Sequence, residues 1–337
     1  VTGAAGFIGS HVVRALVSDG HEVRALHLPT DDLRNLRELD VERFPGDVTD
    51  RETMRRATQG RDHVFHLAAV YALWLRDPER MRRVNVEGSR IVFEEARRAS
   101  VSRVVYTSSI ACFGGQGPRS DATETSPFRL GATGDLYSKS KQEAHELAVS
   151  FAREIDLTIV APTGPIGPGD VGPTPTGRLL LSALTLPLAV VTRTSSNFAD
   201  VRDMARGHLL AAERGVRGET YLLGTANVDL PDLVRMAYAI TGQTKRIVVA
   251  PFCAARVAAR AAVLYADKVS KKAPLFTPEA VAIAKLGLRA ECSKARRDLE
   301  LPQGSIEDAL RDSLVWFARE GCVHDARVRK RLLSYAA

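Results

Sequence analysis

Three side chains that can exchange a proton with a substrate oxygen stand near the middle of the chain. Tyr137 and Lys141 lie four positions apart in GDLYSKSKQEAHELA, and Ser109 precedes them in TSSIACFG. Four residues make about one helical turn, so the tyrosine and the lysine share a face if a helix begins here. The residues between them, 138–140, are then expected to point outward or to flank the pair. The spacing alone also fits a solvated surface helix.

The chemistry that this set could perform is carbonyl reduction, which needs a hydride on carbon and a proton on oxygen. Free tyrosine has a pKa near 10, too high for easy proton exchange at neutral pH. A lysine cation one turn away, together with the positive nicotinamide of an oxidised cofactor, favours the phenolate and lowers that pKa. A serine hydroxyl can hydrogen-bond the carbonyl and stabilise the charge that develops there.

A glycine-rich turn at the start of the chain indicates a dinucleotide site. TGAAGFIG places Gly3, Gly6 and Gly9 in a G-x-x-G-x-x-G pattern, between the end of an apparent strand and an amphipathic helix. Glycines let the backbone turn tightly and approach a pyrophosphate, which the helix N-terminus stabilises. Phe7 and Ile8 belong to the same predicted cofactor-binding turn.

The end of the second strand bears on which dinucleotide binds. An NAD site usually presents a carboxylate to the ribose hydroxyls there, and an NADP site a basic residue. This strand ends ALHL, with His27 near its tip, and TDDLRNL follows. His27 and Arg34 could meet a 2′-phosphate, although Asp31 and Asp32 would oppose it. We therefore expect NADP(H) to be favoured over NAD(H).

Strand and helix patterns alternate through the first half of the chain. Helices are expected at 11–20, 51–60, 78–100 and 137–154, and strands at 21–28, 41–47, 62–69, 103–109 and 157–165. Such alternation predicts an α/β fold with a doubly wound parallel sheet of the Rossmann type. Ligands in such sheets bind beyond the carboxyl ends of the strands, so the loops after Ala69, Ser109 and Pro162 should converge on one cleft.

The alternation ends near residue 165, which predicts two lobes. Residues 1–165 are expected to form the dinucleotide-binding domain, with Val1 at the end of a truncated first strand. Residues 166–323 are expected to form a smaller, mostly helical substrate lobe, partly interleaved with the first, and 324–337 a basic tail. Within this lobe 165–178 is expected to be a loop, and ETYLLG and KRIVVA are the strand candidates.

Composition narrows the classes of function. The 337 residues are 45% hydrophobic and 26% charged, as in globular proteins that bury a sizeable core. The net charge of +7 is spread thinly, with 25 basic and 16 acidic residues over 171–337 against 22 and 24 over 1–170, so we expect no nucleic-acid partner. No apolar run reaches the ~20 residues of a membrane span. Four scattered cysteines indicate reduced thiols and a cytoplasmic location, and no metal site is expected.

Taken together, TGAAGFIG, GDVTD, FHLAA, VNVEGS, VVYTSSIACFG and YSKSK resemble the extended branch of the short-chain dehydrogenase/reductase superfamily, the NAD-dependent epimerase/dehydratase type. PTPTGR and the pattern ending SLVWFARE look most like the dihydroflavonol-4-reductase-like group. That group includes aldehyde and ketone reductases and hopanoid-associated sugar epimerases.

The resemblance implies a role for each matching position. Ser109 would orient the substrate, Tyr137 and Lys141 would complete the catalytic group and also contact the cofactor, and Asn85 would belong to a polar relay. The cofactor would further contact Asp47 and Val48 beside the adenine, Leu67, Ala68 and Ala69 after the fourth strand, Thr107, and Pro162, Thr163 and Gly164 in the stretch that closes over the nicotinamide.

Three functions stay open at this point. Ile110 and Ala111 follow Ser109 where sugar-nucleotide dehydratases of the family carry an Asp-Glu pair, so dehydration is not expected. An aldehyde or ketone reductase is favoured, because Tyr71 and Trp74 should face the substrate. A sugar-nucleotide epimerase is the alternative, with Arg178, Arg193 and Arg202 as candidates for holding a diphosphate. A catalytically silent dinucleotide sensor is the third.

The substrate lobe and the helices of the first domain raise two further expectations. The alanine-rich segment 251–269 could face an apolar substrate, but plain core packing is the favoured interpretation. The helices that carry PERMRRVNVEG and YSKSKQEAHELA could form the seam of a homodimer. The identity of the substrate does not follow from these patterns.

Overall fold

A parallel sheet forms the centre of the first lobe in the computed structural model, which describes residues 1–72, 74–75, 77–271, 274 and 276–335. Four strands pair in the order β3 (His63–His66), β4 (Arg103–Thr107), β5 (Leu157–Pro162) and β9 (Thr220–Leu223). A second parallel pair, β1 (Arg24–His27) with β2 (Glu42–Pro45), joins them through Thr2, which bridges Leu26 and His66. The predicted α/β class and parallel sheet are confirmed.

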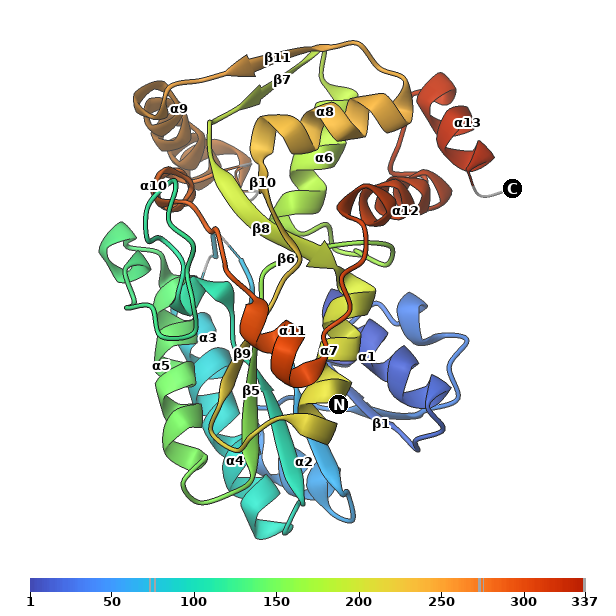
Figure 1. The fold of residues 1–337 in the computed structure, drawn as a ribbon, viewed down its shortest axis with the longest axis vertical. Coiled ribbons are helices and arrows are strands. Elements are labelled where there is room, and N and C mark those ends of the chain that lie inside the picture. The colour runs from blue at the N-terminus through green and yellow to red at the C-terminus, as the bar shows by residue number, and fades with distance from the viewer. Residues whose placement is uncertain (73, 76, 272–273, 275, 336–337) are drawn as a thin grey trace.

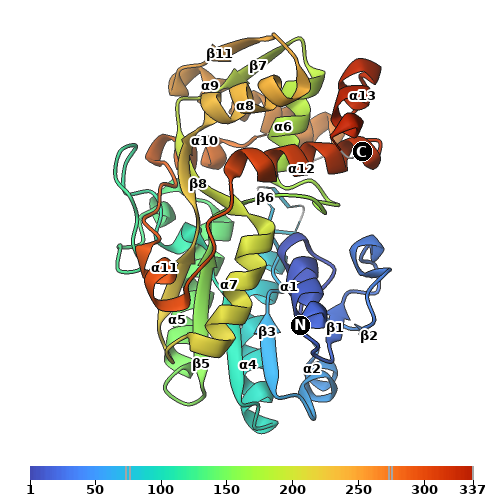
Figure 2. The same cartoon turned by 45° about the vertical axis from the view of Figure 1, so that its right-hand side comes forward.

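Helices cover this sheet as the alternating pattern predicts (Figures 1 and 2). They are α1 (Phe7–Ser18), α2 (Arg51–Thr58), α3 (Glu79–Arg82), α4 (Ser89–Arg98), α5 (Leu136–Phe151) and α7 (Val201–Arg214), with short 3-10 turns at Arg34–Leu36, Ile110–Cys112 and Leu130–Thr133. The single helix expected at 78–100 is interrupted by a π-helical turn at Arg83–Gly88. Such turns widen the helix locally and are frequent at functional sites.

The second lobe contains more strands than the sequence suggested. It holds β6 (Gly164–Ile166), β7 (Leu188–Val191), β8 (Ser195–Asp200), β10 (Ala226–Asp229) and β11 (Arg246–Val249), and the helices α6 (Pro175–Thr185), α8 (Leu230–Thr241), α9 (Phe252–Tyr265), α10 (Pro278–Leu286), α12 (Ile306–Arg319) and α13 (Ala326–Ser334). The helix α11 (Ser293–Leu299) packs instead on α7 and β9 of the first lobe. The expected loop 165–178 instead contains the end of β6 and the first turn of α6. Short strands bounded by Pro and Gly lack the periodicity that would have revealed them.

The two strand candidates of this region belong to different lobes. ETYLLG forms β9 at the edge of the first sheet beside β5, whereas KRIVVA forms β11, which pairs with β7. The chain therefore returns to the first lobe after residue 200.

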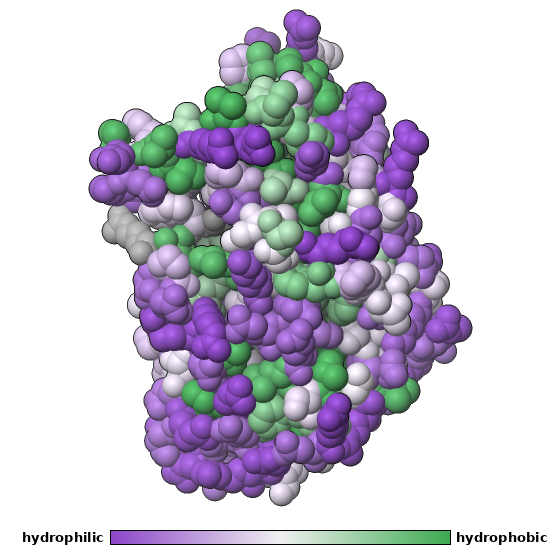
Figure 3. All heavy atoms as spheres, turned by 90° about the vertical axis from the view of Figure 1, so that its left-hand side faces the viewer, coloured by the Kyte–Doolittle hydropathy of each residue, from purple (hydrophilic) through white to green (hydrophobic). Residues whose placement is uncertain are grey.

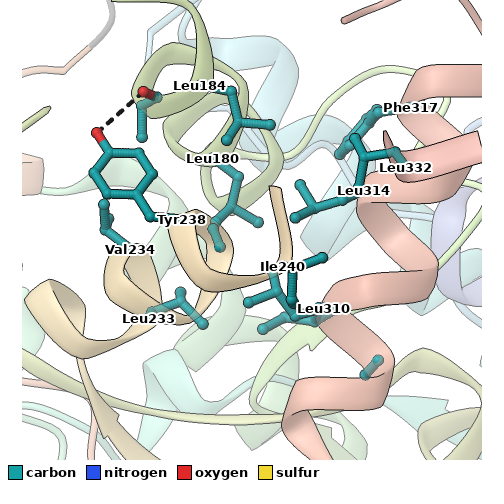
Figure 4. Packing of buried hydrophobic residues seen from close by; sticks show 14 of the residues in the cluster. Leu180, Leu184, Leu233, Val234, Tyr238, Ile240, Leu310, Leu314, Phe317 and Leu332 are labelled. Carbon is teal, nitrogen blue, oxygen red and sulfur yellow. Dashed lines mark hydrogen bonds between the residues drawn. The ribbon is translucent and has the colours of Figure 1, made fainter. Parts of the chain in front are cut away.

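The core of the second lobe joins four helices (Figure 4). Leu180 of α6, Leu233 of α8, Leu314 of α12 and Leu332 of α13 are fully or almost fully buried in one cluster. The Tyr238 hydroxyl donates to the carbonyl of Ala183 at 3.2 Å, so the one polar group of this tyrosine is satisfied inside the apolar cluster. This packing holds helices α6 and α12 against the strands β6 and β8, through which the chain enters the second lobe.

A buried polar chain ties the glycine turn to the first lobe. The His66 ring lies between the hydroxyls of Thr2, 2.8 Å from Nδ1, and Ser89, 2.9 Å from Nε2. Since the Ser89 hydroxyl donates to the carbonyl of Asn85 at 2.7 Å, His66 Nε2–H must donate to Ser89 and Nδ1 must accept from Thr2. Burial lowers the pKa of His66 to about 3, so this ring is a neutral structural link.

One sizeable cavity lies away from the predicted cleft. It has a volume of about 510 Å³ and is lined by the amino ends of β1 and β3, including Arg24 and His63, and by Val1. The loops that the sequence predicts to bind ligands follow the opposite, carboxyl ends of the same strands. None of the described helices is long and apolar enough to cross a membrane.

Candidate active site

The glycine turn closes against two other backbones. Gly3 has a φ of +66°, and a Cβ there would lie 2.8 Å from the amide nitrogen of Ala68. A Cβ on Gly9 would lie 2.1 Å from the carbonyl oxygen of Gly3. Residue 6 is the cap of α1, and no side chain in the described ranges bonds to the first amides of this helix. Those amides can meet an anion, so the turn fits the pyrophosphate of a dinucleotide.

The other predicted cofactor residues lie along the carboxyl edge of the sheet. Leu67, Ala68 and Ala69 directly follow β3, Thr107 ends β4, and Pro162, Thr163 and Gly164 lie where β5 passes into β6. Asp47 accepts from both the amide and the hydroxyl of Thr49, at 2.9 and 2.8 Å, and Val48 is buried against the π turn at Gly88. The structure thus brings these positions to one side of the sheet, around the glycine turn.

The side chains at the end of β1 are arranged differently from what the sequence suggests. His27 is buried, and its Nδ1 lies 2.9 Å from the carbonyl of Leu28. The Asp31 carboxylate folds back and accepts from the amide of Leu28 at 2.9 Å, so a carboxylate does lie at the strand end. Arg34 pairs with Asp32 at 2.7 Å and with Glu320 at 2.5 Å. A turn at residues 28–31 brings Asp31 back to the end of β1, and hydrophobic periodicity does not predict such a turn.

A strap from the second lobe lies over the start of the first. His11 of α1 contacts the carbonyl of Pro168 at 2.8 Å, and the side-chain amide of Asn35 donates to the carbonyl of Gly169 at 2.8 Å. This strap continues the stretch APTGPIGP, which the sequence predicts to close over the nicotinamide. Its attachment to α1 makes the two lobes share one cleft wall.

Lys141 lies in the interior, one turn along α5 from Tyr137. Its side chain is only 3% exposed, and its ammonium donates to the carbonyl of Thr107 at 2.6 Å and to the hydroxyl of Tyr106 at 3.3 Å. The ammonium also lies 4.9 Å from the centre of the Tyr106 ring. Burial lowers the pKa of Lys141 to about 8.

Tyr137, at the start of α5, lies close to Ser109. Burial raises the pKa of Tyr137 well above its usual value, while the nearby Ser109 acts in the opposite direction. The lowering expected from the sequence depends on Lys141 together with an oxidised nicotinamide, and it stays a prediction. The Lys141 ammonium donates to the carbonyl of Thr107. Ser109 itself caps a 3-10 turn by accepting from the amide of Ala111 at 3.1 Å.

The start of α5 is fixed by buried polar contacts. Asp135 caps the helix by accepting from the amide and hydroxyl of Ser138 at 2.7 and 2.5 Å. The Ser140 hydroxyl donates to the carbonyl of Tyr137 at 2.8 Å. Of residues 138–140, expected to point outward or to flank the pair, Lys139 is exposed, whereas Ser138 and Ser140 are buried beside Tyr137 and Lys141. Both serines support the turn that carries Tyr137.

Asn85 is buried between the tyrosine turn and the loop after β3. Its Oδ1 accepts from the amide of Val70 at 2.7 Å, and its Nδ2 donates to the Val70 carbonyl at 3.1 Å and to Ser140 at 2.9 Å. These contacts make Asn85 a positioning residue for the loop and the helix. The structure records no contact from Asn85 to Lys141 among the described residues.

The predicted substrate residues separate into two groups. The Tyr71 ring packs on the Tyr137 ring with centroids 4.7 Å apart, and half of Tyr71 is exposed. Arg178, in the first turn of α6, lies near Asp170, whose pKa is raised by burial, and the charge of Arg178 offsets a small part of that rise. Trp74 instead donates from Nε1 to Asp267 at 3.1 Å, and so links the loop after β3 to the second lobe.

Comparison with known proteins agrees with this geometry. Residues 1–224 match the family described as NAD dependent epimerase/dehydratase. The chain belongs to this family. It is 36% identical over 335 residues to a putative dihydroflavonol 4-reductase of Synechocystis sp., covering 96% of this chain and 95% of that protein. It is 32% identical over 327 residues to sterol demethylase protein B of Methylococcus capsulatus, covering 96% and 99%.

A solved structure gives the same result for the fold. The crystal structure of gox2253 superposes with a TM-score of 0.83 and 36% sequence identity, covering 96% of this chain and 98% of that one. The resemblance to extended short-chain dehydrogenases/reductases predicted from the motifs is confirmed. The protein is therefore an NAD(P)-dependent enzyme of the extended type.

Two buried carboxylates near the predicted site were not recognised from the sequence. Asp170 follows the strap, is 3% exposed, and accepts from the amide and hydroxyl of Thr174. Burial raises the pKa of Asp170 to about 6 despite those bonds and the nearby Arg178. Asp135 raises the pKa of Tyr137 slightly through its charge. The D-x-x-S cap before α5 and the G-D turn in PIGPGD were the available signals for these two carboxylates.

No metal chemistry is suggested by the arrangement. In the parts of the chain that the structure describes, no group of His, Cys, Asp or Glu could hold a metal ion. His145 contacts the Ser108 hydroxyl at 3.1 Å, and His208 lies 3.0 Å from the Thr107 hydroxyl while contacting the Met204 carbonyl at 2.7 Å. Burial lowers the pKa of both rings to about 4, so both support the end of β4 as neutral groups.

Replacing Gly9 by alanine should prevent tight dinucleotide binding, because the new Cβ would collide with the backbone of Gly3. We expect the dissociation constant for NADPH to rise about tenfold or more, which corresponds to ~1.4 kcal/mol. Fluorescence titration of the reduced cofactor measures it. The matched control is Gly172→Ala, whose Cβ would enter open space. Equal affinities for the two variants would show that the turn does not bind the cofactor.

Proposed function

We propose that this enzyme reduces an aldehyde or ketone to an alcohol, using a reduced nicotinamide cofactor and Tyr137 as the proton donor. The observation that carries the proposal is the position of Tyr137, which packs on the Tyr71 ring and lies one helical turn from the buried ammonium of Lys141. A neutral phenol is the acid that reduction consumes. The Rossmann edge beside it offers the cradle for the dinucleotide.

The residues divide the reaction between them. When bound, the cofactor supplies the hydride to the carbonyl carbon. Tyr137 gives its phenolic proton to the carbonyl oxygen, and the Ser109 hydroxyl donates a hydrogen bond to the same oxygen as negative charge develops there. The positive charge of Lys141 stabilises the phenolate that remains on Tyr137. Ser140 and Asn85 hold the tyrosine turn and the loop that carries Tyr71.

The surroundings of the site favour reduction over epimerisation. Dehydration lacks its acid, since Ile110 and Ala111 are buried apolar residues. An epimerase must hold a nucleotide diphosphate, and Arg202 would have to exchange a carboxylate partner, Asp200 or Asp312 at 2.5 and 2.8 Å, to contribute to that site. Tyr71 instead presents an exposed aromatic ring beside Tyr137. An apolar carbonyl compound suits this wall better than a charged sugar nucleotide.

The Tyr137→Phe variant tests the mechanism. It removes the acid but keeps the ring, so turnover should fall by about a hundredfold to ten-thousandfold while NADPH still binds. The measurement is cofactor oxidation across a panel of aldehydes, ketones and sugar nucleotides. Wild-type turnover in the variant would contradict the mechanism. If the wild type interconverts sugar isomers without net cofactor oxidation, the enzyme is an epimerase. If it acts on no compound of the panel, the dinucleotide-sensor hypothesis is favoured.

We propose further that NADP(H) is preferred over NAD(H), with Arg34 binding the 2′-phosphate. Arg34 is 40% exposed at the end of β1, and the phosphate would take the place of one of its two carboxylate partners. His27 adds a second basic residue at the strand tip. Asp31, which caps the amide of Leu28, is the group that opposes this preference.

Arg34→Ala should weaken NADPH binding about tenfold and leave NADH binding unchanged, because one charge-assisted contact to the phosphate is lost. The neighbouring Arg37→Ala, which also removes an exposed arginine, is the matched control. Titration of both cofactors against both variants gives the four constants needed. An equal loss for NADH and NADPH in Arg34→Ala would refute the assignment.

A further inference from the structure

The outer side of α9 is an apolar surface with no covering element. Within α9, which the structure describes in full, only Ala259 is buried. Val257, Leu264 and Tyr265 are 68%, 60% and 59% exposed, and Val269 in the following π-helical turn (Ala266–Ser270) is 64% exposed. The interpretation of 251–269 as a packed core helix is therefore wrong. The reason is that α9 sits at the edge of the lobe, where few elements pack on it (Figure 1).

Cys253, Val257 and Leu264 form an exposed apolar stripe along the helix, which Arg260 interrupts. These four residues follow one another at intervals of four, three and four positions, so they share one face of the helix, with Arg260 between Val257 and Leu264. Ala259, two positions after Val257, faces the opposite way and packs inward. A surface helix usually presents polar residues on its outer side, so a helix that is apolar on both sides indicates something that covers the outer one.

The charged side chains of α9 itself are positive. Arg256 beside the stripe and Arg260 within it are both exposed, and neither pairs with a carboxylate in the described part of the chain. Lys268 is exposed in the next turn. Asp267, in the same turn, accepts from Trp74. A second copy of the protein would bring these arginines together, whereas an anionic lipid surface would attract them.

The stripe also adjoins the candidate active site. Asp267 holds the indole of Trp74 at the end of α9, and the loop of Trp74 carries Tyr71, whose ring packs on Tyr137. In Figure 3 this side of the molecule faces the viewer, and apolar side chains reach the surface of the upper lobe among hydrophilic ones. Whatever covers α9 therefore lies next to the loop that borders the catalytic tyrosine.

We propose that α9 docks the enzyme on an anionic phospholipid surface, with Val257, Leu264 and Tyr265 entering the interface and Arg256 and Arg260 meeting the headgroups. An interfacial helix of this kind combines apolar side chains with basic residues, and a long arginine within the apolar face, such as Arg260, can extend its charged end to the headgroups. If the proposed function holds, the docked site takes carbonyl compounds dissolved in the membrane. This substrate class rests on the proposed reductase activity, but the docking itself does not.

Sedimentation with vesicles tests the docking. The full-length wild type should sediment with phosphatidylcholine vesicles containing about a quarter phosphatidylglycerol, less with pure phosphatidylcholine, and less again at high salt. Val257→Glu combined with Leu264→Glu should reduce binding about tenfold or more, because each removes an inserted apolar side chain. The matched control Val216→Glu alters an equally exposed valine, 59% exposed, on the first lobe and should bind as the wild type does.

Three results would overturn the proposal. The wild type could stay in the supernatant with both kinds of vesicle, or Val216→Glu could lose as much binding as the double variant. Light scattering could also find a dimer that only the α9 variant dissociates, without any vesicle binding, which would assign the stripe to a second copy. Reduction of a water-soluble carbonyl by the double variant is measured in parallel. It should be unchanged, so failure of the reductase assay and failure of docking are separate outcomes.

Discussion

The ammonium of Lys141 is buried against the carbonyl of Thr107, and this contact organises the site. A buried cation needs fixed acceptors, because desolvation disfavours its charged form. The acceptors come from the end of β4, which places α5 at a set height over the sheet edge. Tyr137, one turn earlier on α5, is thereby placed beside Ser109, which follows the same strand. The pKa of Lys141 near 8 measures how much the charged form is disfavoured.

A chain of neutral polar groups holds the glycine turn and the start of α5 in place relative to each other. Asn85 joins the loop after β3 to Ser140 of α5, and the carbonyl of Asn85 continues through Ser89 and His66 to Thr2 in the glycine turn. The turn that would hold a pyrophosphate is thus linked by hydrogen bonds to the turn that carries the proton donor. The π-helical turn at 83–88 supplies the local widening in which Asn85 faces the loop.

The first lobe followed from the sequence far better than the second. Alternating periodicities and the ordered motifs predicted β1 to β5, α1, α2 and α5, and the resemblance led to the family. The placement of Asp31, the burial of Ser138 and Ser140, and the strap from Pro168 to Asp170 did not follow, because each depends on contacts between segments distant in sequence or on turn geometry. The strands β6 and β10 are too short for a periodic signal, β8 (SSNFAD) is too polar to resemble a buried strand, and the exposure of α9 depends on what packs beside it.

The pH dependence of carbonyl reduction tests the central role of Lys141 most directly. Lysine is charged below its pKa, so the rate at saturating cofactor should be constant at low pH and fall as the pH rises through about 8. Tyr137, whose pKa is raised, adds no step in this range. Lys141→Met should be slow at every pH and lack the step. A wild-type rate that stays constant to pH 10, or a variant that keeps the step near 8, would contradict the account.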